Sequence, residues 1–544
     1  MLTRTRIALL CAAAALAVSL PTLRNGFAID DIYVFVDQPA AHSLRNIPQF
    51  FAGGWGMGTT NTQERALNTR YYRPVPTTLG ALEYTLFGLR PAGYHLASAL
   101  LHAATATLVA LLLWQLTGGA IATTFLGGVL FAIHPVQSEA FCAACYQTTL
   151  LAGFFGTLAL VAFGLVLVRG PRLGTLVGLG ASLLLALVSK EESFAIPFFV
   201  LAWVALLRPE GWRRALWPSA IAMAIPLVLV LLLRHAFLVP SKVTYFADEP
   251  ARVVVLTMVR VAGFYLELLV APLQFCPFYD WFIIGYETGI SLAVVTGAVV
   301  LCLAIGAALF FVRRSPLISL GVAWILLGLA PVSQAIPIIV VAADRFLYIP
   351  MLGWVLLVGL LLERGLARAR AAGWIKLPAV AIALLFVAYA VRTVTRVPDW
   401  RNDETLNRAS AEAFPETPIP FLNLATYYER MEKNPAKALE ALAEADRRAP
   451  GWRPARERAA RLKMQIAPQF PDLLCVLHVL CALVLLQFLE DAYVVDLELH
   501  GEGGGRGIAA VVAAQGEVED HVDLLLEGTG AVGIEHGRER HPVH

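Results

Sequence analysis

Residues 146–168 read YQTTLLAGFFGTLALVAFGLVLV, an unbroken run without a charged side chain that ends at Arg169. An α-helix rises 1.5 Å per residue, so about 20 apolar residues cross the ~30 Å hydrocarbon core of a bilayer. This stretch therefore predicts a transmembrane helix. The fold then depends on how often such a run recurs in the chain.

Apolar runs of similar character recur from the N-terminus to about Thr395. Hydrophobic residues make up 58% of the chain and charged residues 15%, whereas soluble domains carry roughly 25% charged residues. The sequence predicts an all-α fold, that of a polytopic membrane protein with about eleven transmembrane helices. The predicted spans are 7–22, 93–115, 121–133, 146–168, 173–189, 193–207, 215–233, 289–312, 316–333, 346–363 and 377–395.

Two apolar segments need a separate interpretation. Residues 7–22 follow two arginines but lack a small-residue cleavage site, so we interpret them as an uncleaved first span rather than a signal peptide. Residues 252–271 carry Arg260 and Glu267, and charges inside a span are costly. We therefore interpret this second segment as an interfacial or re-entrant helix.

The distribution of Lys and Arg sets the predicted orientation, because cytoplasmic loops carry an excess of these residues. With the N-terminus in the cytoplasm, the short turns on that side hold most of them, and the external loops hold few. The bias predicts a cytoplasmic N-terminus and an external location for the region after Thr395. The basic residues on the cytoplasmic side include Arg169, Arg172, Arg208, Arg213, Arg214, Arg313, Arg314, Arg364, Arg368, Arg370 and Lys376.

The chain changes character after the last span. Residues 1–397 form the predicted membrane domain, with a long external first loop at 23–92. Residues 398–466 are rich in Ala, Leu and Glu, and Phe421 to Pro450 fits one tetratricopeptide repeat of about 34 residues. We expect a short external module of tetratricopeptide-like helices there.

The tail at residues 467–544 fits neither pattern. Residues 472–489 are apolar enough for a twelfth helix, and the remainder is rich in Gly, Val and Glu without a readable period. We expect that remainder to be disordered and assign it no function.

Composition excludes several functional classes. The net charge of +2 gives no bulk electrostatic basis for binding nucleic acid. Seven cysteines in 544 residues do not form a disulfide framework. Cys142 and Cys145 make an isolated CxxC, which we interpret as a pair of small packing residues rather than a redox or zinc site.

Under this topology, polar residues at the ends of the spans gather on the external face. Charges where helices meet a membrane surface are costly unless they pair or serve a site. Their concentration on one face, against plain Arg-rich turns on the other, predicts an external active site. The clusters are Asp30 with Asp31, Arg73 in the first loop, His134 with Glu139, Lys190 with Glu191, and Asp344 with Arg345.

Each cluster also has a purely structural interpretation. The aspartates would serve as solvated loop residues, and the histidine, which precedes a proline, would cap the end of a span. Lys190 with Glu191, and Asp344 with Arg345, would form local ion pairs. These alternatives stay open for each cluster alone, whereas the joint pattern favours a site.

A series of short motifs runs through the chain in a fixed order. They are Asn25-Gly-Phe-Ala-Ile-Asp-Asp, Tyr72-Arg-Pro, Gly93-Tyr-His-Leu with His102, Phe131-Ala-Ile-His-Pro-Val-Gln-Ser-Glu-Ala, Ser189-Lys-Glu, Pro331-Val-Ser-Gln-Ala-Ile-Pro, Asp344-Arg-Phe-Leu-Tyr-Ile-Pro and Asp399-Trp-Arg-Asn-Asp-Glu-Thr-Leu. Over about residues 1–465, this series resembles the transmembrane and tetratricopeptide repeat-containing family. That family is a branch of the GT-C glycosyltransferases that includes protein O-mannosyltransferases.

The chain departs from the family pattern in places. Asp344-Arg345 stands where the family usually has Glu-Arg, and Gln137 stands where a second histidine is usual. The repeat array is also shorter than in the family. These differences bear on the exact reaction rather than on the GT-C-like fold.

The resemblance implies an enzyme, a glycosyltransferase that moves a sugar, with mannose as the candidate, from a polyprenyl-phosphate carrier to a protein or glycan acceptor. The reaction would take place on the external face and invert the anomeric centre. An acceptor hydroxyl needs a carboxylate base, for which Asp30 or Asp31 is the candidate, as base or metal ligand. The leaving phosphate needs cationic donors. The candidates for binding substrate or phosphate are Arg73, Lys190 and Arg345, with His134, Glu139, Glu191 and Asp344 beside them.

The expected partners are the lipid-linked donor, the acceptor, membrane lipids and a protein bound by the repeat module, with no nucleic acid. No cofactor is indicated. A divalent metal stays open as an alternative, but the sequence does not indicate one because no tight ligand spacing appears in it. The sparse loops and the short module point to a bacterial inner membrane with the module in the periplasm. An endoplasmic reticulum location would satisfy the same topology.

Two other classes of function are compatible with a polytopic chain. A polyprenyl-lipid transporter or flippase would place charges at mid-membrane on interrupted helices, often with internal symmetry. A non-catalytic scaffold would use the repeat module as its working part. The sequence specifies neither the sugar, the lipid length nor the acceptor.

Overall fold

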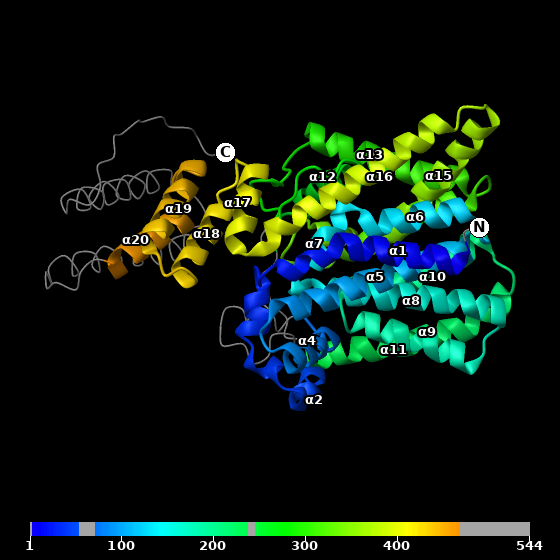
Figure 1. Ribbon diagram of the computed structural model, residues 1–544, viewed down its shortest axis with the longest axis horizontal. Helices are drawn as coiled ribbons and strands as arrows, with labels where there is room; N and C mark the ends of the chain where they lie inside the picture. The colour runs from blue at the N-terminus through cyan, green and yellow to red at the C-terminus, as the bar shows by residue number, and fades with distance from the viewer. Residues whose placement is uncertain (1–2, 54–70, 238–244, 247–248, 467–544) are drawn as a thin grey trace, which may run out of the picture. The chain divides into compact units, whose positions relative to one another are not determined.

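The computed structural model describes residues 3–53, 71–237, 245–246 and 249–466 (Figure 1). Within these ranges every regular element is a helix, so the all-α prediction is confirmed for them. The chain divides into two compact units, Met1–Leu462 and Lys463–His544. Almost all described residues belong to the first unit. The predicted twelfth helix at 472–489 lies outside the described residues.

Each of the eleven predicted spans coincides with a helix, and one further long helix, α12, lies among them. The apolar helices of the bundle are α1 (Arg4–Ser19), α5 (Pro91–Leu116), α6 (Ile121–Ile133), α8 (Gln147–Arg169), α9 (Leu173–Leu187), α10 (Ile196–Leu207), α11 (Trp212–Phe237), α12 (Ala251–Val270), α13 (Leu292–Phe311), α14 (Pro316–Leu329), α15 (Met351–Ala371) and α16 (Lys376–Arg396).

The chain is an integral, multi-pass membrane protein, but the count of eleven spans is not confirmed. Among the described residues, seven helices are long and apolar enough to cross a membrane. An eighth arises if α6 and the segment Pro135–Cys142, which is bent by 47° from α6 and ends in the short α7 (Ser138–Cys142), form one span. The remaining predicted spans are helices that are shorter or that carry charges.

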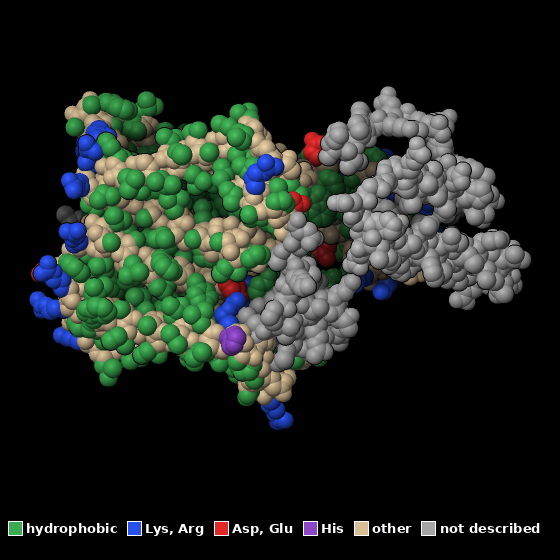
Figure 2. Space-filling model, turned by 180° about the vertical axis from the view of Figure 1, so that it is seen from behind, with side chains coloured by type: hydrophobic (Ala, Val, Ile, Leu, Met, Phe, Trp, Pro, Cys, Tyr) green, Lys and Arg blue, Asp and Glu red, His purple; other side chains and the backbone are tan. Residues whose placement is uncertain are grey.

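The two ends of the helical bundle differ in charge. Helices α1, α5, α8, α9 and α11 lie side by side in Figure 1, each packed against the next. Figure 2 shows Lys and Arg side chains gathered at one end of the bundle. The turns at this end join α8 to α9, α10 to α11 and α13 to α14, and they carry exposed arginines such as Arg169, Arg208 and Arg313.

Helix α12 is long enough to span, yet both of its halves contact the opposite, polar end of the bundle. Its first half meets the segment just before α13: Arg260 pairs with Glu287 at 3.0 Å. Its last turn meets the end of α6, where His134 Nε2 donates to the Leu269 carbonyl at 3.0 Å. It also meets the second half of α16, where Tyr389 Oη donates to the Val270 carbonyl at 2.8 Å. Where α12 crosses α13, a Cβ on Gly297 would lie 1.9 Å from the Val259 carbonyl oxygen, so only glycine fits. These contacts favour the interfacial interpretation.

Short helices bring polar residues into the bundle. Helices α9 and α10 contain 15 and 12 residues, which at 1.5 Å per residue is less than the ~30 Å of a bilayer core. Between them, residues 188–190 and the turn η7 (Glu191–Ala195) carry Lys190, Glu191 and Glu192. Because the helices end early, these charges lie among the helix ends rather than beyond them.

The C-terminal helices follow η10 (Val397–Arg401) at the polar end. They are α17 (Asp403–Ala413), α18 (Ile419–Arg430), α19 (Pro435–Arg448) and α20 (Arg453–Ile466). Helix α17 begins with a capping box between Asn402 and Thr405. Helices α18 to α20 share a small apolar core that includes Leu424, Tyr428 and Leu442. Their assignment to tetratricopeptide repeats stays a prediction, as does the boundary at 397.

Candidate active site

The first motif of the chain, Asn25–Asp31, forms a loop at the polar end of the bundle; we name it the aspartate loop. It is attached to the segment that follows α16. The Asn25 side-chain amide donates to the Val397 carbonyl at 2.9 Å, and the Gly26 N–H donates to the Arg401 carbonyl at 2.9 Å. Two motifs that lie more than 360 residues apart in the sequence are therefore hydrogen-bonded to each other.

Ile29 holds the aspartate loop in a strained shape. Its φ is 52°, a left-handed conformation that costs a β-branched residue about 1–3 kcal/mol. The Ile29 N–H donates to Oδ1 of Asp403 at 2.5 Å. This hydrogen bond, together with those of Asn25 and Gly26, keeps the turn in a conformation that isoleucine would otherwise avoid.

Asp31 is fully buried and its carboxylate is occupied by backbone donors. Oδ1 accepts from the Cys145 N–H at 2.6 Å and Oδ2 from the Ala28 N–H at 3.2 Å. Burial raises the pKa of Asp31 to about 7, although these backbone hydrogen bonds oppose the rise. The geometry fits an anchor that joins the aspartate loop to the start of α8.

Asp30 differs from its neighbour. It is partly exposed, and no described residue donates a hydrogen bond to its carboxylate. Burial raises its pKa; Arg345 acts to lower it, and the nearby negative charges of Asp403 and Glu139 act to raise it. Asp30 is therefore the carboxylate of the pair that is able to accept a proton from a bound molecule.

Glu139 on α7 and Arg345 on η9 (Asp344–Leu347) form a buried ion pair. Glu139 Oε1 accepts from Arg345 Nη1, and Oε2 accepts from the Arg345 backbone N–H at 2.7 Å. The guanidinium also lies over the Tyr146 ring, 4.3 Å from its centroid. Nη1 is the one guanidinium nitrogen with a hydrogen-bond partner among the described residues, so donors remain for a ligand.

Asp344 does not pair with Arg345, so the interpretation of these two as a local ion pair is wrong. Oδ1 of Asp344 accepts from Tyr279 Oη at 2.7 Å. Burial and then the charge of Glu139 raise the pKa of Asp344 well above its ordinary value. Adjacent residues on η9 thus serve different partners because the turn directs their side chains apart.

Lys190 likewise does not pair with its sequence neighbour Glu191. Its Nζ pairs with Glu192 at 2.8 Å and donates to Thr149 Oγ1 at 2.7 Å. Glu191 instead accepts from Arg73 at 2.6 Å and from Arg234 at 2.9 Å. The expected local pair is therefore replaced by a Lys190–Glu192 pair and by two ion pairs of Glu191. These join Glu191 to Arg73, just before α4 (Pro74–Phe87), and to Arg234 on α11.

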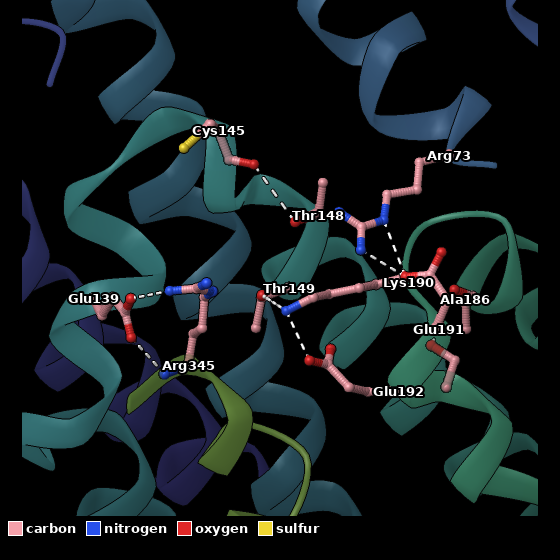
Figure 3. A network of polar contacts seen from close by, with 11 residues as sticks. Arg73, Glu139, Cys145, Thr148, Thr149, Ala186, Lys190, Glu191, Glu192 and Arg345 are labelled. Carbon is pink, nitrogen blue, oxygen red and sulfur yellow. Dashed lines mark hydrogen bonds and ion pairs between the residues drawn. The ribbon is translucent and has the colours of Figure 1, made fainter. Parts of the chain in front are cut away.

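Arg345, Lys190 and Arg73 form a row of cations, each with its own carboxylate (Figure 3). Burial lowers the pKa of Lys190, and the charges of Arg345 and Arg73 lower it further, while Glu192 opposes. Lys190 is thus close enough to both arginines to be repelled by each of them. We name Arg345, Lys190 and Arg73 the cation row.

His134 lies outside this row and has no free ring nitrogen. Nδ1 accepts from the Val136 N–H at 3.3 Å, so Nε2 carries the proton and donates to the Leu269 carbonyl at 3.0 Å. The ring also packs against Tyr389 at 4.8 Å. These contacts fit the helix-end interpretation of His134 and link α6 to α12.

Several residues of the site were not among the sequence candidates. Asp403 lies inside a motif quoted from the sequence and Glu192 directly follows one, but neither had a role assigned. Arg234 ends an otherwise apolar span, which is itself a signal, because a lone basic residue at a span end needs a partner or water. Thr149 and Tyr279 carry no signal in the sequence.

No three His, Cys, Asp or Glu side chains gather in a metal-binding arrangement within the described residues. A surface cavity of ≈ 180 Å³ lies between α12, residues 271–284 and Phe414. Asp30 and the cation row do not line it. The candidate site is thus defined by its charged side chains rather than by this cavity.

The fold and the site together define a multi-pass helical membrane protein with a buried network of ion pairs at one end. The chain is 25% identical to the protein O-mannosyl-transferase Tmtc3 of Drosophila melanogaster over 457 residues, 70% of this chain and 48% of that protein. It is 23% identical to TMTC3 of Mus musculus, over 77% of this chain and 48% of that protein. TMTC2 of Mus musculus is 30% identical over 28% of this chain and 18% of that protein.

These relatives confirm the resemblance to the transmembrane and tetratricopeptide repeat-containing proteins. The chain spans about half the length of the relatives that it matches over most of its own length. No protein-family model matches it. The crystal structure of ArnT from Cupriavidus metallidurans bound to undecaprenyl phosphate covers 80% of this chain and 75% of that chain at 16% identity, with a TM-score of 0.38. A TM-score of this size does not establish a shared fold.

Proposed function

We propose that the protein is a membrane glycosyltransferase that moves a sugar from a polyprenyl-phosphate carrier to a hydroxyl of a protein or glycan acceptor. The observation that carries the proposal is the Asp30 carboxylate, which accepts no hydrogen bond from a described residue and lies in the field of Arg345. The relatives are named protein O-mannosyl-transferases, so we propose mannose as the sugar.

Asp30 is the proposed general base. The acceptor hydroxyl attacks the anomeric carbon, its proton passes to a carboxylate oxygen of Asp30, and the bond from the anomeric carbon to the phosphate oxygen breaks. Attack from the side opposite the phosphate inverts the anomeric centre. A carboxylate whose pKa is raised by burial is a stronger base than a solvated one, and a positioned base contributes roughly 10²–10⁴-fold to the rate.

The cation row is the proposed phosphate site. The departing lipid phosphate gains negative charge, which fixed cationic donors stabilise best where water is excluded. Arg345 is 10% exposed at its side chain and has unused N–H donors. Glu139, Glu192 and Glu191 hold the three cations in place before the phosphate arrives. Asp344 orients Arg345 through the turn that they share.

The location of these groups suits a lipid-bound donor. The site lies at the end of the bundle opposite the Arg-rich turns, which we propose to be cytoplasmic because basic loops stay inside. The donor would then be used on the external face, the periplasmic face of a bacterial inner membrane. Helices α17 to α20 would contribute acceptor or partner binding there, as tetratricopeptide-like helices do.

The test is transfer of radiolabelled sugar from a polyprenyl-phosphate donor in membranes that contain wild type, Asp30→Asn, Asp31→Asn or Glu210→Gln. Glu210 is an exposed carboxylate in the turn before α11 and serves as the control. We expect Asp30→Asn to lose at least about 10²-fold in rate while its thermal unfolding matches wild type. Asp31→Asn should lower stability as well, because that carboxylate holds two backbone N–H groups.

Equal transfer by wild type and Asp30→Asn would remove Asp30 from the chemistry. If folded wild type transferred no label, the glycosyltransferase proposal would fail. A transporter would instead move the lipid across the membrane without breaking the sugar–phosphate bond, and a scaffold would do neither.

A further inference from the structure

Asp403 is the first residue of α17, yet it does not cap its own helix. That task falls to Asn402, whose side chain accepts from the Thr405 N–H at 2.9 Å. Asp403 instead reaches across to the aspartate loop and accepts the Ile29 N–H. Its carboxylate is therefore used for the loop that carries Asp30 rather than for local helix stability.

The hydrogen bond acts at the strained residue that immediately precedes Asp30. A left-handed isoleucine persists only where the surroundings over-determine it, and here Asp403 supplies an acceptor on one side while Asp31 anchors the other side to Cys145. Asp30 lies between these two fixed points. Its backbone position is therefore set by both.

We propose that Asp403 is a positioning residue that holds Asp30 in its reactive place, and this inference rests on the proposed function. Through Asp403, the segment that opens the C-terminal helices becomes part of the catalytic arrangement. The role is distinct from general folding stability, because it acts through Asp30 alone.

Charge adds a second effect. The charges that act most on Asp30 are those of Arg345 on η9, Asp403 on α17 and Glu139 on α7. Cys145 and Tyr146, just before α8, also interact with it. Burial raises the pKa of Asp30 first, Arg345 lowers it, and Asp403 and Glu139 raise it. Removing the charge of Asp403 should therefore lower the pKa of Asp30. Because the base must be deprotonated, the acid limb of the pH–rate profile should move to lower pH.

Two substitutions separate the two effects. Asp403→Asn keeps an oxygen acceptor for the Ile29 N–H and removes the charge, whereas Asp403→Ala removes both. Glu404→Gln is the matched control, since Glu404 is the next carboxylate on α17 and bonds Arg408 and Tyr428 instead. Each is made in the full chain and compared by the pH dependence of kcat and KM, and by hydrogen exchange of a peptide that covers residues 25–33.

We expect Asp403→Asn to shift the acid limb to lower pH with little change in hydrogen exchange. Asp403→Ala should speed exchange in the aspartate loop and lower kcat by about tenfold to a hundredfold, because a small misplacement of a reacting group has effects of that size. KM should change little. Glu404→Gln should match wild type in all three measurements.

The decisive comparison uses the double variant Asp30→Asn, Asp403→Ala. If Asp403 acts through Asp30, the residual rate of Asp30→Asn should not fall further when Asp403 is also changed. An additional loss of the same size would assign Asp403 a separate structural role and overturn the proposal, as would a wild-type kcat and pH profile in Asp403→Ala. Absence of transfer by wild type would instead refute the proposed function, and the role of Asp403 with it.

Discussion

The two ends of the helical bundle use charge in opposite ways. At one end Arg169, Arg208 and Arg313 lie exposed in short turns, and none of the ion pairs found among the described residues involves them. At the other end Glu139 and Lys190 are buried and each has a defined partner. An exposed charge stays hydrated, so another residue of the same sign can replace it with little effect on stability. A buried charge depends on one specific partner for its stabilisation.

This difference predicts that equal substitutions at the two ends have very unequal effects. A charge in an Arg-rich turn stays hydrated after its neighbours change. A buried ion that loses its partner keeps the full cost of desolvation. The loss of stability caused by substitutions at each end therefore tests this difference between exposed and buried charges.

The largest effect is expected from Glu139→Gln. The change leaves the buried Arg345 guanidinium without its carboxylate, which should destabilise the protein by about 3–5 kcal/mol. Thermal unfolding in detergent measures the loss, with Arg169→Gln as the control at the other end. The second substitution Arg345→Met should recover part of the loss, because it removes the unpaired charge. A melting temperature equal to that of wild type in Glu139→Gln would contradict a buried, structural ion pair.

The substitution Glu191→Gln should have a smaller effect on stability, and the size of that effect should depend on pH. Burial acts to raise its pKa, but Arg73 and Arg234 prevail and lower the pKa from 4.5 to about 2. A folded-state pKa below the unfolded value stabilises the protein above pH 4.5, and this stabilisation, on the order of 3 kcal/mol, is lost as the pH falls toward 2. Unfolding followed between pH 6 and pH 2 should show a steeper decline for wild type than for Glu191→Gln. Parallel curves would show that the two arginines do not hold this carboxylate.

Asn402→Ala should cost about 1 kcal/mol, the usual worth of an N-cap. The substitution removes the acceptor for the Thr405 N–H at the start of α17. Equilibrium unfolding measures the loss, and Asn434→Ala, which removes the cap of α19, gives a matched comparison further from the site. The two caps should contribute similar stability, while sugar transfer should fall more for Asn402→Ala. Equal sugar transfer by the two variants would show that the start of α17 does not affect the function of the aspartate loop.

The smallest effect is expected at the Arg-rich end. The double substitution Arg313→Gln, Arg314→Gln should change stability by no more than about 0.5 kcal/mol per residue, as is usual for exposed positions. Thermal unfolding and sugar transfer should both match wild type. A loss as large as that of Glu139→Gln would remove the distinction between the two ends.

The sequence predicts the helices well because an apolar run of sufficient length has few alternatives in a membrane. The count of eleven spans stays a prediction, because α9 and α10 are short and the chain bends by 47° between α6 and the segment Pro135–Cys142. The interpretation of residues 252–271 as interfacial depended on Arg260 and Glu267, and the contacts of α12 at the polar end favour it.

The candidate residues were predictable as a group but their partners were not. Glu139 and Arg345 are 206 residues apart, so nothing in their local sequence relates them. Neighbours along the chain, such as Asp344 and Arg345, looked like pairs and are not. Asp30 and Asp31 are adjacent and chemically identical in sequence, and only their surroundings separate an anchored carboxylate from one that accepts no hydrogen bond from a described residue.

The attachment of the aspartate loop to the segment after α16 has a consequence for biosynthesis. Asn25 is made early, but its partner Val397 follows 372 residues later, and Ile29 waits for Asp403 across 374. Contacts of such long range form late, and domains are completed from the N-terminus during synthesis. The ribosome must therefore deliver α16 and the start of α17 before the first loop can close. The aspartate loop, although it is encoded early, therefore reaches its final structure only after these late segments have been made.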